Sequence, residues 1–248
     1  MEIQTASVSS GNLMHYCQGC THKTVNNILA DVIDDLGIAG RITGIAPVGC
    51  SSYLMNYLNV DILAGPHGRG PAMATAIKEL TNRLVFTYQG DGDMAAIGTA
   101  EIFHAAVRAN NFTVIYVNNA TYGMTTGQSS PTSLLGQKTR TDKNGRDSGN
   151  PFDIAMLLSK MPGVRYVERV SCNSAENVEK TRAAIRKAFE NQMAFDSGLS
   201  IVEVMAICPP SLKKSVADAN VWLHDDLLDV YYPGLLSERN LGVLCDGS

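Results

Sequence analysis

Residues 84–93 read LVFTYQGDGD, and residues 112–123 read FTVIYVNNATYG. Each stretch opens with an apolar run that predicts a buried strand, Leu84–Tyr88 in the first and Phe112–Val117 in the second. The polar segments that follow are Gly90-Asp91-Gly92-Asp93 and Asn118-Asn119-Ala120-Thr121-Tyr122-Gly123. Parallel strands of an α/β sheet place their carboxyl ends at one edge, where ligands bind. We therefore expect these two polar segments to converge on a single site.

The residue types in these segments suit a magnesium ion and a diphosphate. Mg²⁺ prefers oxygen ligands in octahedral geometry, and it usually takes one or two protein carboxylates together with substrate phosphates. Gly90 and Gly92 allow the backbone to approach a diphosphate closely. Gly-Asp-Gly alone is more often an ordinary turn. The second polar segment, which follows a strand of its own, favours a binding site instead.

Helices and strands are predicted to alternate along the chain. Apolar residues recur at helical spacing over Thr24–Leu36, and Gly37 offers a stop. The other predicted elements are strands at Arg41–Ala46, Asp61–Ala64, Arg165–Val170 and Leu199–Met205, a helical turn at Tyr53–Tyr57, and helices at Gly68–Leu80, Ile97–Arg108, Phe152–Lys160 and Ser174–Asn191. This order predicts an α/β fold, with a mostly parallel sheet and helices on both faces. We expect a single domain over residues 1–248.

Two segments depart from this alternation. Ala120–Asn150 is rich in Gly, Ser and Thr, and a loop that long within a compact domain is either functional or disordered. Because it begins with the candidate ligand residues, we favour a functional loop. The segment after Cys208 contains Trp222, Leu227 and Tyr231 and is too apolar to be free in solution. We expect it to pack on this domain or on another chain.

Composition excludes several classes of protein. The chain has 248 residues, of which 45% are hydrophobic, so it can bury a substantial core. Its formal net charge of −4 and scattered basic residues argue against nucleic-acid binding. No apolar run approaches the roughly 18 residues of a membrane span, and the polar start with Glu2 does not resemble a signal peptide. Six cysteines without such a signal indicate a reducing compartment, and we expect a cytoplasmic protein.

The cysteines form one short motif and several isolated positions. Cys17-Gln18-Gly19-Cys20 is a C-x-x-C that could be half of a zinc site, half of an iron–sulfur site or a redox dithiol. Cys50 and Cys208 each follow a predicted strand end, which brings them to the edge of the candidate site. Four thiolates are the usual ligands of an iron–sulfur cluster. Cys172 and Cys245 lack such a context, and we interpret them as ordinary thiols.

Together these residues resemble the β subunit of 2-oxoacid:ferredoxin oxidoreductases, which carries thiamine diphosphate and an iron–sulfur cluster. The resemblance runs from Tyr16 to about Tyr232, and it is greatest to the branch that acts on branched-chain 2-oxoacids or 2-oxoglutarate. The motifs that carry it are Cys17-x-x-Cys20, Gly49-Cys50-Ser51, His67-Gly68-Arg69, Gly90-Asp91-Gly92-Asp93, Asn119-x-x-Tyr122-Gly123-Met124-Thr125, Gly127-Gln128-x-Ser130-Pro131-Thr132 and Cys208-Pro209. Jointly these motifs are highly specific.

The resemblance implies a set of site residues. Asp91 and the Asn119 side chain would ligate Mg²⁺, with the Thr121 carbonyl as the third protein ligand. The implied cofactor-binding residues are Gly49, Cys50, Ser51, His67, Gly90, Asp91, Gly92, Asp93, Asn119, Thr121, Tyr122, Gly123, Met124 and Thr125. The implied ligands of one [4Fe–4S] cluster are Cys17, Cys20, Cys50 and Cys208.

Three positions depart from the family pattern. Gln18 stands where the family usually has Pro, and Lys23 and Thr126 stand where it has Gly. None of these changes removes a ligand, but Thr126 adds a Cβ beside the cofactor loop.

His67 is placed to donate to a phosphate oxygen and is also our candidate for proton transfer to the substrate. The remaining histidines are interpreted as structural: His15, His22, His104 and His224.

The resemblance also implies an activity and partners. The implied reaction is the coenzyme A-dependent oxidative decarboxylation of a 2-oxoacid to acyl-CoA and CO₂, with electrons passed through the cluster to ferredoxin. Thiamine enzymes bind the aminopyrimidine on a second domain, so we expect an α subunit, and also a γ subunit or domain. The alternatives are a non-redox thiamine decarboxylase or synthase, and a catalytically silent subunit with structural zinc at Cys17 and Cys20.

Overall fold

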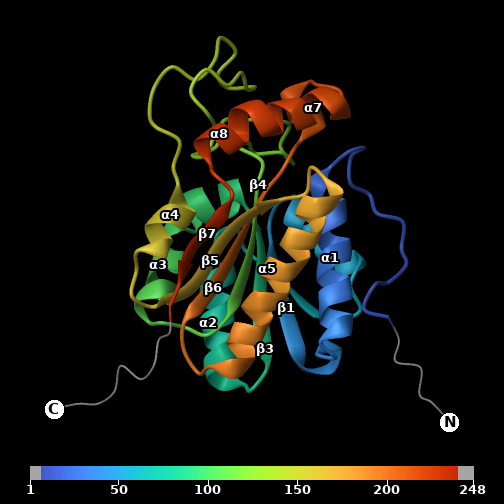
Figure 1. Ribbon diagram of the computed structural model, residues 1–248, viewed down its shortest axis with the longest axis vertical. Helices are drawn as coiled ribbons and strands as arrows, with labels where there is room; N and C mark the ends of the chain where they lie inside the picture. The colour runs from blue at the N-terminus through green and yellow to red at the C-terminus, as the bar shows by residue number, and fades with distance from the viewer. Residues whose placement is uncertain (1–6, 240–248) are drawn as a thin grey trace.

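The computed structural model describes residues 7–239, so Glu2 and Cys245 lie outside the described residues. Within that range the chain forms a seven-stranded sheet of order β2-β1-β3-β4-β6-β5-β7. The strands are β1 Ile42–Pro47, β2 Asp61–Gly65, β3 Leu84–Gly90, β4 Thr113–Asn118, β5 Val164–Ser171, β6 Leu199–Met205 and β7 Gly234–Glu238. All neighbouring strands are parallel except β5 and β7. Figure 1 shows β7 at one edge of this sheet.

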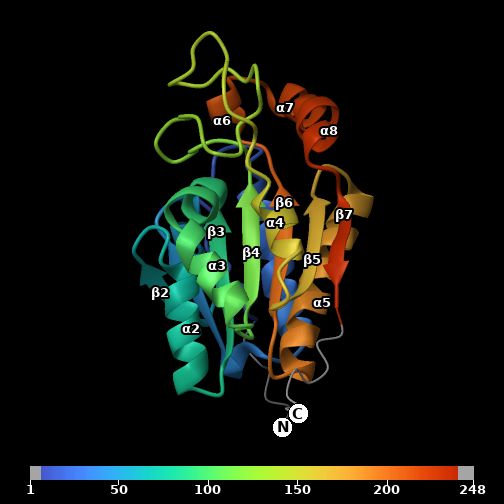
Figure 2. The ribbon, with the colours of Figure 1, turned by 90° about the vertical axis from the view of Figure 1, so that its left-hand side faces the viewer.

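Helices cover both faces of the sheet, as the alternating sequence predicts. The α-helices are α1 Thr21–Asp35, α2 Gly70–Leu80, α3 Thr99–Val107, α4 Ile154–Ser159, α5 Ala175–Ala194, α6 Pro209–Leu212, α7 Val216–Trp222 and α8 Leu228–Val230. Helices α1 and α5 contribute to the buried cluster on one face, and α2, α3 and α4 contribute to the cluster on the other. Figure 2 shows the second face, with α2, α3 and α4 in front of the strands.

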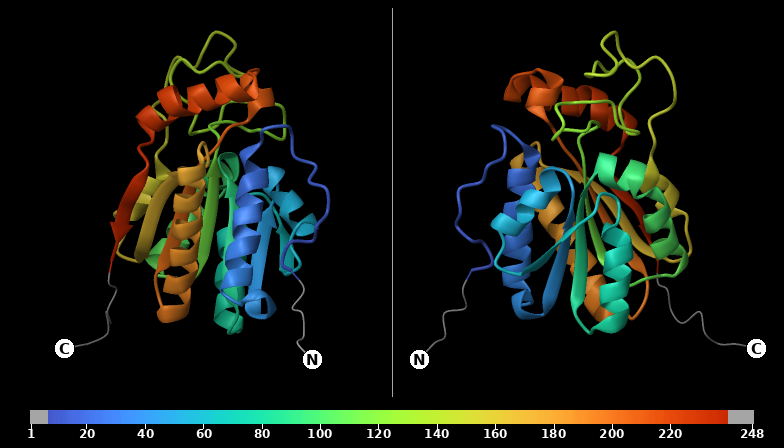
Figure 3. Two further views of the ribbon diagram at one scale, coloured as in Figure 1. Left: turned by 45° about the vertical axis from the view of Figure 1, so that its right-hand side comes forward. Right: turned by 180° about the vertical axis from the view of Figure 1, so that it is seen from behind.

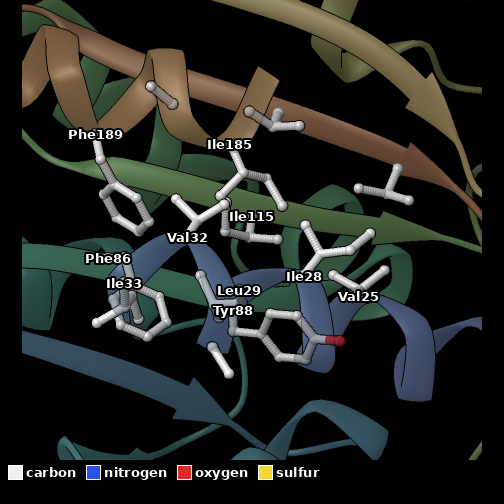
Figure 4. Close-up of a cluster of buried hydrophobic side chains, with 14 of the residues drawn as sticks. Val25, Ile28, Leu29, Val32, Ile33, Phe86, Tyr88, Ile115, Ile185 and Phe189 are labelled. Atoms are coloured by element: carbon white, nitrogen blue, oxygen red, sulfur yellow. The ribbon is translucent and has the colours of Figure 1, made fainter. Parts of the chain in front are cut away.

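The core beneath α1 shows why the sequence adopts this layering. Val25, Ile28, Leu29, Val32 and Ile33 are buried along one stripe of the helix. They pack toward aromatic and aliphatic side chains of β3, β4 and α5, which Figure 4 labels. Burying one such side chain stabilises the fold by about 1.5–3 kcal/mol relative to leaving it exposed. The helical spacing of these residues therefore fixes α1 against the sheet.

The structure contains each element predicted between Thr24 and Met205, with ends that differ by a few residues. Helix α1 begins earlier than predicted, at Thr21, directly after Cys20 in extended conformation. The turn predicted at Tyr53–Tyr57 is a 3₁₀ helix over Cys50–Asn56. A π-helical turn over Asp93–Ile97 precedes α3, and no sequence pattern had indicated it. Such turns are frequent at functional sites.

The C-terminal tail, residues 209–232, lies over the carboxyl ends of the strands. It forms α6 and α7, a π-helical turn at Leu223–Leu227, and α8. Its buried side chains, including Trp222 and Tyr231, share a hydrophobic cluster with Ala120 and Leu134 of the long loop over residues 120–150. Figure 3 shows the tail and this loop together at one end of the molecule. Of the two locations expected for the tail, the structure shows packing on this chain.

Candidate functional site

A pocket lies at the carboxyl ends of β1, β3 and β4, where the sequence predicted a site. Its lining contains all fourteen residues expected to bind a cofactor, which are Gly49-Cys50-Ser51, His67, Gly90–Asp93, Asn119 and Thr121–Thr125. The parallel strands bring these separate segments together, since each follows or lies beside a strand end. His22 and Val48 line the pocket as well. The sequence analysis had given neither residue a role in binding.

Asp91 is a buried carboxylate held by two hydroxyl groups. Only 2% of its surface is exposed, and its Oδ2 accepts hydrogen bonds of 2.6 Å from Ser130 Oγ and from Thr132 Oγ1. Burial raises the pKa of Asp91 to about 6, and these two hydrogen bonds limit the rise. Among the described residues, no ion pair with a basic side chain involves Asp91. A buried carboxylate in this setting suits a bound cation.

The second half of the site is a tight turn after β4. Ala120 adopts a left-handed conformation, with φ of 54°, and its N–H donates to Asn118 Oδ1 at 3.1 Å. Asn119 is buried, and its Oδ1 accepts from the Thr121 N–H at 3.2 Å. An amide oxygen has two lone pairs, so Asn119 retains one for a ligand in the pocket. The turn therefore places Asn119 in the lining of the same pocket as Asp91.

The Asp93 carboxylate holds His67 in position and is itself held by two further groups of the protein. His67 Nδ1 lies 2.5 Å from Asp93 Oδ1, which also accepts from the Gly68 N–H at 2.7 Å. Gln89 Nε2 donates to Asp93 Oδ2 at 2.5 Å. Because Nδ1 faces the carboxylate, Nε2 is the nitrogen left for a ligand. Asp93 lines the pocket as expected, and its Oδ1 orients His67 while its Oδ2 accepts from Gln89.

Close packing explains one glycine of the site, and Thr126 shows a departure from the family pattern. A Cβ on Gly92 would lie 2.1 Å from Cε1 of Tyr122, so the ring can pack there only against glycine. Thr126 has φ of 80°, a left-handed conformation that favours glycine. Its hydroxyl contacts the Arg140 guanidinium within the long loop. The loop thus adopts the backbone conformation typical of glycine although a threonine occupies the position.

A second cavity of about 320 Å³ adjoins the first. Its lining includes Cys17, Cys20, Cys50 and Cys208, the four cysteines that the sequence grouped. They come from the segment before α1, the start of the 3₁₀ helix after β1, and the residue before α6. The two cavities share five lining residues: His22, Cys50, Asn119, Gly123 and Met124. Cys172 lines neither cavity, and its thiol donates to Thr181.

Burial disfavours ionisation of three thiols of this second cavity, those of Cys20, Cys50 and Cys208. Burial, together with the neighbouring thiols, raises the pKa of Cys20 to about 12 and that of Cys50 to about 11. A cluster requires thiolates, so its iron would have to offset these costs. A positively charged group that binds several thiolates at once would supply this compensation.

His22, which the sequence analysis had left as structural, lies between the two cavities. It is 3% exposed, and its Nδ1 lies 2.7 Å from Tyr88 Oη. Burial lowers the pKa of His22 to about 4, so its imidazole is neutral at pH 7. Its ring stacks on Tyr16 at a centroid distance of 5.4 Å. The signal that could have identified it is its position two residues after Cys20, in the first turn of α1.

Two further observations concern metals and membranes. Within residues 7–239, no group of three or more His, Cys, Asp or Glu side chains is arranged to hold a single metal ion. The Asp91 site would combine one carboxylate with an amide oxygen and a backbone carbonyl, which are also oxygen ligands of Mg²⁺. In the same part of the chain, the helices lack the combination of length and apolar character needed to cross a membrane.

Comparisons with known proteins identify the kind of domain that this chain forms. The family model "Thiamine pyrophosphate enzyme, C-terminal TPP binding domain" matches residues 47–204. The ketoisovalerate oxidoreductase subunit VorA of Methanothermobacter marburgensis is 36% identical over 88% of this chain and 46% of its own length. The 2-oxoglutarate synthase subunit KorB of Archaeoglobus fulgidus is 34% identical over 82% of this chain and 73% of its own length.

A solved structure has the same fold. It is a 2-oxoglutarate:ferredoxin oxidoreductase from Magnetococcus marinus, with 2-oxoglutarate, coenzyme A and succinyl-CoA bound. The TM-score is 0.77 at 23% sequence identity, and the match covers 96% of this chain and 85% of that chain.

Fold and site together define a thiamine pyrophosphate-binding domain, and the chain belongs to that class. Within the class, the chain belongs to the family of 2-oxoacid:ferredoxin oxidoreductase subunits that includes VorA and KorB. It spans about half the length of the VorA proteins that it matches. The family predicted from the sequence motifs is thereby confirmed.

Proposed function

We propose that this chain is the cofactor-binding subunit of a 2-oxoacid:ferredoxin oxidoreductase. The proposed reaction converts a 2-oxoacid, of the 2-oxoisovalerate type or 2-oxoglutarate, with coenzyme A to an acyl-CoA and CO₂. Electrons leave through a [4Fe–4S] cluster to ferredoxin. The observation that carries this proposal is the contact between the two cavities, because Cys50, Asn119, Gly123 and Met124 line both.

The proposed magnesium ligands are the Asp91 carboxylate, the Asn119 amide oxygen and the Thr121 carbonyl. Asp91 supports this assignment because it is buried without a basic partner among the described residues. A cation at this position would offset the desolvation that raises its pKa. Ser130 and Thr132 hold Oδ2 and so fix the orientation of the carboxylate before metal arrives.

The chain's own residues would bind and orient the cofactor. When bound, thiamine diphosphate supplies the electron sink that decarboxylation of a 2-oxoacid requires. The backbone at Gly90 and Gly92 would lie along the diphosphate. His67, oriented by Asp93, would direct Nε2 toward a phosphate oxygen. Proton transfer to the substrate is the alternative, catalytic role for the same nitrogen, because one N–H cannot serve the phosphate and the substrate at once.

The proposed cluster ligands are Cys17, Cys20, Cys50 and Cys208. Four thiolates are the usual ligand set of a [4Fe–4S] cluster, and these four thiols line one cavity of about 320 Å³. All are free thiols in this structure. Free thiols are typical of a reducing compartment, so we place the proposed enzyme in the cytoplasm.

An α subunit would complete the site. The pocket encloses only about 110 Å³, well below the roughly 300–1,000 Å³ of a typical small-molecule site. Exposed apolar side chains border the two cavities, with Val48 48%, Met124 41% and Tyr53 37% exposed. Both observations support a second chain that carries the pyrimidine-binding domain. We treat residues 1–248 as a single cofactor-binding domain, and we propose a γ subunit or domain as a further partner.

The test is anaerobic purification of the chain alone and together with its α and γ subunits. We expect iron and sulfide in both preparations, because the four thiols belong to this chain. Only the complex should reduce viologen in the presence of a 2-oxoacid and coenzyme A. Zinc without iron in the complex, or equal turnover by the isolated chain, would contradict the proposal. A panel of 2-oxoacids would then identify the substrate.

A further inference from the structure

The C-terminal tail is connected to both halves of the proposed metal site by a continuous series of buried contacts. We call this series the tail network, and it consists of Asn118, Asp91, Thr132, Arg169, Glu203 and Tyr231. All of these side chains are buried, with none more than 2% exposed. They come from β4, the end of β3, the long loop, β5, β6 and the tail. Neither the sequence motifs nor the proposed reaction assigns a function to the members from β5, β6 and the tail.

The first arm of the network runs from Asp91 to the tail. Thr132 Oγ1 donates to Asp91 Oδ2 at 2.6 Å, and the carbonyl of the same Thr132 accepts from Tyr231 Oη at 3.0 Å. Tyr231 therefore holds the residue whose hydroxyl orients the proposed metal ligand. Ser130, which bonds the same Asp91 oxygen, lies 2.9 Å from Thr132 Oγ1. The position of Thr132 thus affects both hydroxyl groups on Asp91.

The second arm runs from the turn after β4. Asn118 accepts from the Ala120 N–H and donates through Nδ2 to Glu203 Oε1 at 2.8 Å. Glu203 Oε2 in turn accepts from Arg169 Nε at 2.6 Å. This arm anchors the left-handed turn that presents Asn119 and the Thr121 carbonyl.

The two arms meet at the ring of Tyr231. The Arg169 guanidinium carbon lies 5.2 Å from the ring centroid, within range of a cation–π interaction. Burial raises the pKa of Tyr231, and the neighbouring carboxylates Glu203, Asp153 and Asp91 raise it further. Tyr231 therefore stays protonated at pH 7, and its hydroxyl acts as a donor to Thr132.

We infer that Tyr231 is a positioning residue for the metal site, through which the tail sets the orientation of Asp91. This inference rests on the proposed function, because it takes Asp91 as the Mg²⁺ ligand. In this arrangement the tail would be required for tight metal binding as well as for covering the loop. Groups that orient metal ligands through hydrogen bonds typically affect metal affinity by about 10–100-fold. Tyr231 acts one bond further from the metal, so we expect a smaller effect.

The experiment compares two adjacent tyrosines in the full complex. Tyr231→Phe removes the bond to Thr132 but keeps the ring beside Arg169, whereas Tyr232 is 67% exposed and Tyr232→Phe is the matched control. Calorimetric titration with Mg²⁺ at saturating thiamine diphosphate measures the metal affinity. We expect Tyr231→Phe to weaken Mg²⁺ binding about fivefold and Tyr232→Phe to leave it unchanged. Melting of the metal-free complex checks that both variants are folded.

A double-mutant cycle separates positioning from general destabilisation. Thr132→Val removes the hydroxyl on Asp91, so Tyr231→Phe should have little further effect in that background. Equal Mg²⁺ affinities for Tyr231→Phe and Tyr232→Phe, or fully additive effects of Tyr231→Phe and Thr132→Val, would overturn the inference. Asp91→Asn is the reference variant. If it binds Mg²⁺ as the unmodified complex does, the proposed metal site itself is wrong; if only Asp91→Asn weakens binding, the positioning role alone fails.

Discussion

The two adjoining cavities are built in different ways. The pocket at the strand ends is fixed by hydrogen bonds within the protein, such as those on Asp91 and between His67 and Asp93. The cysteine cavity instead gathers thiols from three separate segments, and burial opposes the ionisation of Cys20 and Cys50. The first site is therefore formed before its ligand binds. The thiolates of the cysteine cavity would have a positively charged partner only when a metal centre binds. That metal centre would link the segment before α1 to the residue before α6.

The largest effects are expected when the four thiols of the cysteine cavity are removed one at a time. These substitutions distinguish cluster binding in one cavity from cofactor binding in the other. Cys17→Ser, Cys20→Ser and Cys208→Ser should each lose the cluster, measured as iron and sulfide, while retaining Mg²⁺-dependent cofactor binding. Cys50→Ser should impair both, because Cys50 lines both cavities.

Two remaining cysteines serve as controls for this series. Cys172 lies in neither cavity lining, and Cys245 lies beyond the described residues. Cys172→Ser and Cys245→Ser should keep full iron content. Iron loss in Cys172→Ser equal to that in Cys208→Ser would show that the fourth ligand is wrongly assigned.

The converse prediction concerns the first cavity. Asp91→Ala should abolish Mg²⁺-dependent binding of thiamine diphosphate, because it removes the carboxylate that we place on the metal. Iron content should stay unchanged, since no cysteine contacts Asp91 in the described hydrogen-bond network. Calorimetry measures cofactor affinity, and the iron assay provides the internal control. Undiminished cofactor affinity in this variant would refute the assignment of Asp91.

A smaller effect is expected from two glycines of one turn. Gly92→Ala would place a methyl group 2.1 Å from a ring carbon of Tyr122, whereas a Cβ on Gly90 meets nothing within 4 Å. Overpacking of this kind costs about 1–3 kcal/mol. Chemical denaturation of the cofactor-free protein should therefore show a loss of that size for Gly92→Ala and little change for Gly90→Ala. Similar losses in both would mean that Tyr122 does not pack on Gly92.

The same comparison shows what the sequence could and could not predict. The strand-end pocket was predictable because each segment follows a local apolar run, and parallel strands end at one edge. The same rule placed Cys50 and Cys208 at this edge because both follow strand ends, while Cys17 and Cys20 joined them through the C-x-x-C motif and the family resemblance. In both cases the deciding pattern spans only a few consecutive residues.

Contacts between distant residues were not predictable in this way. Arg169 and Glu203 sit inside predicted strands, and nothing local indicates that they pair or that Tyr231 lies beside them. The roles of Ser130 and Thr132 were missed although their motif was recognised, because a hydroxyl carries no signal of its partner. The antiparallel β7 was also missed, since its pairing with β5 joins segments far apart in the chain.

The raised pKa of Asp91 has a consequence for the metal-free protein. Its value of about 6 in the folded state exceeds the ordinary value of 3.8, so the folded state binds a proton more tightly than the unfolded state. The stability that this proton supplies is fully present below about pH 3.8 and is lost as the pH rises through 6. Denaturation of Asp91→Asn should lack this component of the pH dependence, which distinguishes Asp91 from other titrating groups.

Metal binding should show the opposite dependence on pH. Mg²⁺ competes with the proton on Asp91, so its apparent affinity should fall about tenfold for each pH unit below 6 and be constant above. Calorimetric titrations between pH 5 and pH 8, at about half a unit apart, measure this slope. The cysteine cavity provides the contrast, because the pKa values of Cys20 and Cys50 lie near 12 and 11, above that range. An affinity that does not change below pH 6 would place the metal on a ligand other than Asp91.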